Sequence, residues 1–296
     1  RDFSAAITAA SAVIGAMIPP SILMIIYASV MEISVVAMFA GGVLPGFLVA
    51  LLLFGLTAYY AARRNYPRRQ ERLTFRKVLT VLQHATIPLL MPIIIIGGIL
   101  SGVFTPTEAA AVAAAYGFLA GLLLRSLTWE KVKDILVNTI ITSSVILLLI
   151  ATAKMMSWLL TSQMIPQLVA DGITTLTENR YVFLIIANVV LLLVGMVMDP
   201  GGAIIRLGPV LAPTAIELGV DPLHFALILT INIIVGLVTP PIGFVLYTTA
   251  GVANMSLARL SRTLLPFIAV ELVMVLLVTY IPFFTLYIPR LLGFHG

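Results

Sequence analysis

Two stretches decide the fold: Gly15-Ala16-Met17-Ile18-Pro19-Pro20 and Gly236-Leu237-Val238-Thr239-Pro240-Pro241, each inside a long apolar segment. They contain the only Pro-Pro pairs of the chain, and each has a glycine four residues before its first proline. A proline pair inside a membrane helix removes two N–H donors and interrupts the helical hydrogen bonds. Unwound backbone at membrane depth persists only where it is packed in protein or lines a cavity. Both stretches are therefore candidate ligand sites.

The composition indicates an all-α polytopic membrane protein. Of the 296 residues, 61% are hydrophobic and 10% are charged, whereas charged residues make up about 25% of an average soluble domain. The formal net charge of +5 does not predict nucleic-acid binding, because the cations lie in short loops between apolar segments and report topology instead. The absence of cysteine excludes disulfides and thiolate chemistry. The start at Arg1-Asp2-Phe3, without a methionine, predicts that an N-terminal part is missing.

Apolar segments and positive loops predict the topology. Loops rich in Lys and Arg at residues 63–72, 125–133 and 259–262 are expected in the cytoplasm. Residues 74–85 predict a short interfacial helix, and Thr105-Pro106-Thr107-Glu108 has the residue pattern of a helix start. The expected membrane segments lie near residues 3–31 (broken at 19–20), 43–62, 87–104, 108–124, 134–160, 222–252 (broken at 240–241) and 264–289.

A sharp turn, Asp199-Pro200-Gly201-Gly202, separates two short apolar arms within residues 181–218. Each arm is at or below the length that crosses a bilayer. The pattern predicts a re-entrant hairpin that enters and leaves from the outer side, since residues 161–180 carry little positive charge.

The two broken segments are expected to run in opposite directions. Four full spans and a hairpin separate them, so the first runs outward and the second runs inward. Their flanks also match, because Ser11 and Asn232 each lie four residues before the glycine. This is the pattern of an inverted repeat, and broken helices in such repeats bind the ions and substrates of transporters. The alternative is that two ordinary proline kinks coincide by chance.

Each break predicts a cation site, because unwound backbone exposes carbonyl oxygens and Na⁺ prefers oxygen ligands. We expect one site within Gly15–Ser21 and one within Gly236–Gly243. Ser21 and Thr239 add hydroxyl oxygens, and the glycines allow unusual dihedral angles. The free N–H groups of the opposed half-helices are expected to face an anionic substrate.

Four ionisable residues lie in apolar surroundings, where charge indicates function. Asp199 is the strongest candidate, although a turn-forming role is an open alternative. Arg206 either reaches a substrate carboxylate or, as we favour, forms a structural pair. We assign no functional role to Lys154 or Glu271. The sequence holds no metal-ligand spacing and no phosphate-loop, HExxH or GxSxG motif, so we expect a protein that is not an enzyme.

Several motifs together resemble the large, DctM-like membrane subunit of tripartite ATP-independent periplasmic (TRAP) transporters. The resemblance covers nearly the whole chain. Its residues are Arg1–Ala6, Ile14–Ile22, Ala40–Gly46, Ser101–Ala109, Met198-Asp199-Pro200, Pro209, Pro213, Gly219–Asp221, Gly236–Gly243 and Leu265–Phe267.

The resemblance implies a sodium-driven elevator transporter in a bacterial inner membrane. A periplasmic (DctP-like) binding protein would deliver an organic acid such as a C4-dicarboxylate or sialic acid. A small (DctQ-like) membrane subunit would brace the scaffold. Na⁺ is then the coupling ion, and no cofactor is expected. The alternative is a stand-alone ion-coupled anion carrier or antiporter of the same superfamily.

The resemblance also assigns roles to residues. It implies one Na⁺ site with backbone ligands at Gly15, Ile18 and Pro20, completed by a hairpin that precedes Asp2 in the family. The internal repeat assigns the second site, which is expected at Gly236, Thr239, Pro241 and Gly243. Asp199 matches an acid near the substrate, with Ser21, Gly201 and Arg206 as further substrate-site candidates, although Gly201-Gly202 and Arg206 are less typical of the family.

The expected domains follow from this assignment. Residues 1–32 hold the broken helix of the first repeat, and residues 33–133 hold an arm helix with the scaffold and linking helices. Residues 134–252 hold the transport part of the second repeat, with hairpin 181–218 and broken helix 222–252. Residues 253–296 hold another arm helix and the last scaffold helix; the arms lie near 33–42 and 254–263.

Overall fold

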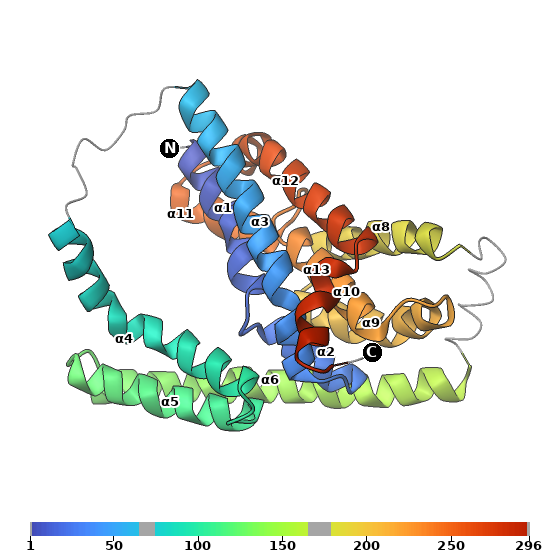
Figure 1. Ribbon diagram of the computed structural model, residues 1–296, viewed down its shortest axis with the longest axis horizontal. Coiled ribbons are helices and arrows are strands. Elements are labelled where there is room, and N and C mark those ends of the chain that lie inside the picture. Colours follow the sequence, from blue (N-terminus) through green and yellow to red (C-terminus); the bar gives the residue numbers. More distant parts are fainter. Residues whose placement is uncertain (1, 65–74, 165–178, 295–296) are drawn as a thin grey trace. The chain divides into compact units, whose positions relative to one another are not determined.

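The computed structural model describes residues 2–64, 75–164 and 179–294, and within these ranges every regular element is a helix (Figure 1). The expected all-α membrane protein is confirmed. Most of the positive cluster at 63–72 and of the loop at 161–180 lies outside the described residues. The helices are α1 (Asp2–Met17), α2 (Ile22–Met31), α3 (Val35–Arg63), α4 (Phe75–Leu100), α5 (Pro106–Leu123), α6 (Trp129–Ser162), α8 (Arg180–Val197), α9 (Pro200–Glu217), α10 (Pro222–Gly236), α11 (Phe244–Ala253), α12 (Leu257–Tyr280) and α13 (Phe283–Leu291).

Several helices have the length and composition of membrane spans. In the described part of the chain five helices are long and apolar enough to cross a bilayer, and six if the bent pair α1–α2 counts as one span. The helices are α3, α5, α6, α8 and α12. Helix α9 is not among them, although its partner α8 is.

The chain folds into two compact units. One comprises Arg1–Tyr60 with Leu148–Gly296, and the other comprises Ala61–Leu147. The smaller unit contains α4, α5 and most of α6. Helix α5 begins at the expected helix start and has a capping box, because Glu108 N–H donates to Thr105 Oγ1 at 3.3 Å and Thr105 N–H donates to Glu108 Oε2 at 2.8 Å. Tyr116 then ties α5 to α4 by donating its hydroxyl to Ile87 O at 2.7 Å.

Helix α10 is the core of the larger unit. Every residue from Leu223 to Gly236 is buried, as expected for a helix that is apolar on all sides. It packs against α8, α9, α12 and α13, and also touches α1 and α2. The second broken helix is therefore held by protein along its whole first half, and the burial fixes where its break lies.

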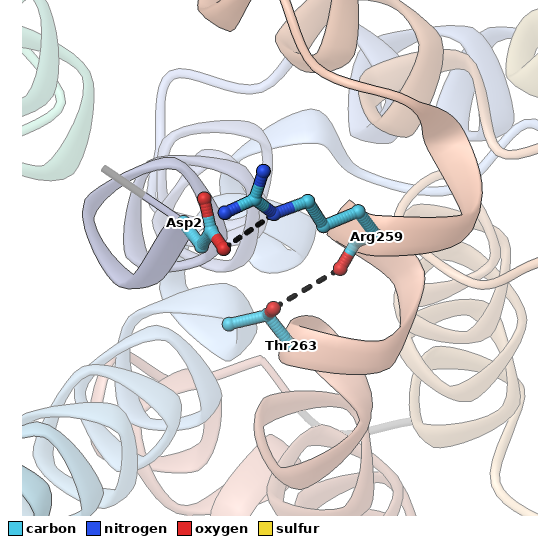
Figure 2. A network of polar contacts seen from close by, with 3 residues as sticks. All are labelled: Asp2, Arg259 and Thr263. Atoms are coloured by element: carbon cyan, nitrogen blue, oxygen red, sulfur yellow. Dashed lines mark hydrogen bonds and ion pairs between the residues drawn. The ribbon is translucent and has the colours of Figure 1, made fainter.

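Helix α1 is fastened to α12 at its start. Arg259 Nε donates to Asp2 Oδ2 at 2.7 Å, and Thr263 Oγ1 donates to Arg259 O at 3.0 Å (Figure 2). The Phe3 and Phe267 rings meet at 5.8 Å between centroids. Because the Arg259 side chain is 67% exposed, this ion pair contributes little stability. The contact between the half-buried Phe3 and the buried Phe267 contributes more.

Three segment boundaries differ from the expectation. Residues 33–42 and the following span form one continuous helix, α3, which runs through Pro45. Helix α4 likewise joins the expected interfacial helix and the next span. The span expected to reach residue 289 ends at Tyr280 and resumes as α13 after Pro282. Proline cannot continue the helical hydrogen bonds at this point, so this last break was readable from the sequence.

Candidate functional site

The first break separates α1 from α2, which meet at a bend of 41°. Pro19 and Pro20 have no N–H, so the carbonyl oxygens of Gly15 and Ala16 lose their helical donors. Ser21 compensates one of them by donating Oγ to Ala16 O at 2.6 Å. Gly15 O accepts none of the hydrogen bonds among described residues, and a side chain at Gly15 would meet open space. The first break therefore offers an exposed, unpaired carbonyl oxygen.

Helix α3 packs tightly on this break. A Cβ at Gly46 would lie 2.5 Å from Ile18 Cγ1, and one at Gly42 would lie 3.2 Å from Met17 O. A larger residue at either position would require Met24 or Ile18 to shift. The two glycines lie four residues apart, on one face of the helix, so this face of α3 packs closely on the break.

The second break links α10 to α11 and is anchored on the hairpin. Gly243 N–H donates to Met196 O at 3.0 Å, at the end of α8. The carbonyl of Leu237, deprived of its donor by Pro241, accepts from Val245 N–H at 3.0 Å. Thr239 turns its hydroxyl back onto Val235 O at 2.8 Å and is 6% exposed. The Thr239 hydroxyl therefore bonds within its own helix, and the oxygens available to a ligand at this break are backbone carbonyl oxygens.

Gly243 brings carbonyl oxygens together at the second break. Its φ is +42°, and a Cβ there would lie 2.8 Å from Leu237 O and 3.0 Å from Thr239 O. Within the described residues the carbonyl oxygens of Thr239 and Pro241 accept no hydrogen bond. Carbonyl oxygens of this kind are ligands that a hard cation takes.

Two glycines bring the hairpin and the second broken helix into backbone contact. A Cβ at Gly236 would lie 2.6 Å from the Cα and carbonyl carbon of Gly195. A Cβ at Gly195 would lie 3.0 Å from Ile233 O. The role of Gly236 is therefore close helix packing rather than an unusual dihedral angle, because it is the last residue of the regular helix α10.

The turn of the hairpin touches both broken helices. Its first side reaches the second break through Met196, as described above. On its other side a Cβ at Gly201 would lie 3.5 Å from Ile26 Cδ1 of α2, and α9 packs along α2. Asp199 is exposed and caps α9 by accepting from Gly202 N–H at 2.9 Å. Asp199 therefore forms the turn, the alternative that the sequence left open, and one of its oxygens makes this bond.

The half-helices after the breaks both start without a side-chain cap. In the part of the chain that the structure describes, α2, α11, α12 and α13 have no such cap, whereas α5, α8, α9 and α10 are each capped by a side chain. Ser21 occupies the N-cap position of α2 but donates its hydroxyl to Ala16 O instead of accepting. Both proline pairs are joined by a cis peptide bond. Uncapped helix N-termini attract negative charge through their free N–H groups and the helix dipole.

A buried polar network, missed by sequence reasoning, supports the second site. Asn232 Nδ2 donates to Asn188 Oδ1 of α8 at 2.8 Å, and Asn188 Nδ2 donates to Thr279 Oγ1 of α12 at 3.1 Å. His224 Nε2 lies 3.1 Å from Thr279 O. The signal was present, since Asn188 and Asn232 are uncharged polar residues inside apolar helices, where side chains hydrogen-bond across helices. Only the fold shows that they meet.

Replacing Asn188 by leucine is expected to destabilise the protein by about 1–2 kcal/mol, because the buried Asn232 amide and Thr279 hydroxyl each lose a partner. Thermal unfolding of the purified protein measures this loss. The exposed neighbour Val189→Leu is the control and should unfold as the wild type does. The double variant Asn188→Leu/Asn232→Leu should recover part of the loss, since both ends of one bond are then apolar. Additive losses would contradict direct coupling.

The other ionisable residues in apolar segments differ in their surroundings. Arg206 is exposed on α9 and forms no ion pair in the described part of the chain, so the favoured structural pairing is not found there. Lys154 pairs with Glu32 at 2.5 Å. Glu271 is fully buried, and neither of its carboxyl oxygens has a hydrogen-bond partner among the described residues. Among the described residues no cluster of His, Asp or Glu has metal-site geometry.

Broken apolar helices that meet around a hairpin are the pattern of multi-pass membrane transporters. The chain belongs to the DctM component family of tripartite ATP-independent periplasmic transporters, whose family model matches residues 1–284. The expected family is thereby confirmed.

Several relatives match this chain along nearly its whole length. The chain is 41% identical to the uncharacterized protein YgiK of Salmonella typhimurium, over 98% of this chain and 66% of the relative. It is 39% identical to the C4-dicarboxylate TRAP transporter large permease protein DctM of Pseudomonas aeruginosa, over 99% and 69%. It is 36% identical to the sialic acid TRAP transporter large permease protein SiaM of Vibrio cholerae, over 100% and 69%. The chain thus spans about two thirds of the length of these relatives.

Proposed function

We propose that this permease takes up an organic acid by Na⁺-coupled secondary active transport. The observation that carries the proposal is the pairing of two proline breaks with unpaired carbonyl oxygens on one hairpin turn. Carbonyl oxygens suit Na⁺, and the uncapped starts of α2 and α11 suit a carboxylate. A cation and an anion bound side by side neutralise each other, which explains why substrate and Na⁺ would move together.

The proposed residues divide by chemistry. Backbone oxygens of Gly15, Ile18 and Pro20 hold one Na⁺, and those of Gly236, Thr239, Pro241 and Gly243 hold the second. Ser21, Gly201 and Arg206 border the proposed substrate position. Asp199 acts through its negative charge, which attracts Na⁺ to the turn and so lowers the repulsion between the turn and a substrate carboxylate.

The names of the relatives support an organic acid without selecting one. One relative is named for C4-dicarboxylates and another for sialic acid, so both classes are candidates for this chain. A binding protein that delivers the substrate and a small membrane subunit are the proposed partners, in the inner membrane of a bacterium. An elevator movement of the hairpin and the broken helices against the remaining helices is the proposed transport step.

Uptake into proteoliposomes tests the proposal. The protein, reconstituted with its small subunit, should accumulate labelled substrate only with an inward Na⁺ gradient and only when the binding protein is outside. An equal K⁺ gradient is the control and should give no accumulation. Thermal-shift screening of the binding protein with organic acids selects the substrate beforehand. Uptake that persists without the binding protein would support the stand-alone carrier instead, and uptake without Na⁺ would overturn the coupling.

A further inference from the structure

A cavity of about 280 Å³ lies away from both breaks, where α8 and α10 begin, α12 ends and α13 begins. Arg180, Tyr181, Asp221, His224, Tyr280 and Arg290 are among the residues that line it. Helix α12 carries Arg259 near its other end, and its 24 residues correspond to about 36 Å of helix. The cavity therefore lies at the opposite end of this unit from the Asp2–Arg259 pair.

His224 lies in the lining with both ring nitrogens hydrogen-bonded. His224 Nδ1 lies 2.6 Å from Thr285 Oγ1, and its Nε2 lies 3.1 Å from Thr279 O. Thr279 also bonds Asn188 in the buried network. These contacts hold the imidazole in place, so the arginines are the groups of the lining that can pair with an anion.

Two guanidinium groups of the lining lack a carboxylate partner among the described residues. Arg180 and Arg290 form no ion pair in the described ranges. Arg180 Nη2 donates to Tyr181 OH at 2.9 Å, and its guanidinium lies 4.9 Å from the centre of that ring. This contact orients the planar donor group and uses one of its several N–H donors. Arginine at such a site binds a carboxylate with two parallel hydrogen bonds.

Asp221, the acid named in the lining, hydrogen-bonds to backbone N–H groups. Asp221 Oδ1 accepts from Leu223 N–H at 2.9 Å and from His224 N–H at 3.1 Å, which caps α10. The lining thus combines two arginines with one aspartate whose contacts are to backbone, and its net charge is positive. Tyr280 adds to the rigidity of the wall by donating its hydroxyl to Tyr181 O at 3.2 Å.

We propose that this cavity is a second anion site, which binds a small organic acid through Arg180 and Arg290. Its volume is at the lower end of ligand pockets, which suits a molecule of a few carbons rather than a drug-sized one. The site is separate from the proline breaks, so its occupation does not depend on the Na⁺-coupled mechanism proposed above. Its ligand is the free acid, and the carboxylate contacts both guanidinium groups at once.

Arginine footprinting tests this assignment residue by residue. Phenylglyoxal modifies free guanidinium groups, and mass spectrometry measures the rate at each arginine of the purified protein in phosphatidylcholine nanodiscs. Succinate is the probe and its neutral diamide is the control compound. Succinate should slow the modification of Arg180 and Arg290 by about threefold or more, as expected for a bidentate charge-assisted contact. Arg262, which is exposed and forms no ion pair in the described residues, should react at an unchanged rate.

Variants of the two arginines test whether Arg180 and Arg290 bind the same ligand molecule. Arg290→Gln should abolish the protection of Arg180, and Arg180→Gln should abolish that of Arg290, because each guanidinium holds the same carboxylate. Arg262→Gln is the matched control and should leave both protections intact. Independent protection of the two arginines, equal protection by the diamide, or no protection would overturn the proposal. Protection by phosphatidylglycerol without succinate would also overturn it, since the occupant would then be a lipid headgroup.

Discussion

Replacing Gly236 by alanine is expected to destabilise the protein and abolish uptake. The new Cβ would lie 2.6 Å from the backbone of Gly195, and backbone cannot rotate away as a side chain does. Overpacking of this kind costs about 1–3 kcal/mol, more than the gain of about 1 kcal/mol that alanine brings to a helix. Helices α8 and α10 would have to move apart, which would also break the bond between Gly243 N–H and Met196 O.

Thermal unfolding in detergent and Na⁺-driven uptake measure these two effects of Gly236→Ala. Gly251→Ala is the matched control, because Gly251 is an exposed glycine within α11 and a Cβ there meets nothing within 4 Å. The control should unfold at the wild-type temperature or slightly above it and should transport normally. A Gly236→Ala variant with wild-type stability and uptake would show that the contact with Gly195 does not hold the second break in place.

Replacing Asp199 by asparagine is expected to reduce uptake about tenfold or more at low Na⁺ while leaving stability unchanged. Asparagine caps a helix about as well as aspartate does, so the bond from Gly202 N–H is retained. The variant loses only the negative charge that, in the proposed mechanism, attracts Na⁺ to the hairpin turn. Raising the Na⁺ concentration should therefore restore much of the uptake.

Initial uptake rates against Na⁺ concentration, with unfolding temperature in parallel, test the role of Asp199. Asp199→Ala is the comparison variant, since it removes both charge and cap and should lose about 1 kcal/mol of stability in addition. If the Asp199→Asn variant transports as the wild type does at every Na⁺ concentration, Asp199 only forms the turn and its charge has no part in transport. The inferred link between the turn and Na⁺ would then be wrong.

The proline breaks, the hairpin and the capping box were predictable because each rests on local chemistry. Proline lacks an N–H wherever it stands, so both pairs end a helix within a few residues whatever surrounds them. Thr105 and Glu108 are close enough in sequence to form their bonds without outside help. A single proline is less decisive, because the last expected span is divided just before Pro282 whereas α4 continues through Pro88 and Pro92.

Other features depended on packing between distant segments. The sequence divided an arm near 33–42 from a span at 43–62, yet α3 runs through both, and Gly42 and Gly46 pack that helix against the first break. Arg206 suggested a structural pair, yet no carboxylate meets it in the described residues. Local propensity cannot reveal which partner a residue meets across helices.

By itself the sequence determined that this is a helical membrane protein with two matching breaks and a hairpin between them, since apolar length and missing N–H groups are properties of the chain. Only the tertiary structure decided how these parts meet. In the fold, Gly195 packs against Gly236, Gly243 N–H donates to Met196 O, and Gly201 lies beside α2. The starts of α2 and α11 have no side-chain caps among the described residues. The physical reason is that a backbone group's partner depends on which helices pack together, and packing is a property of the folded whole.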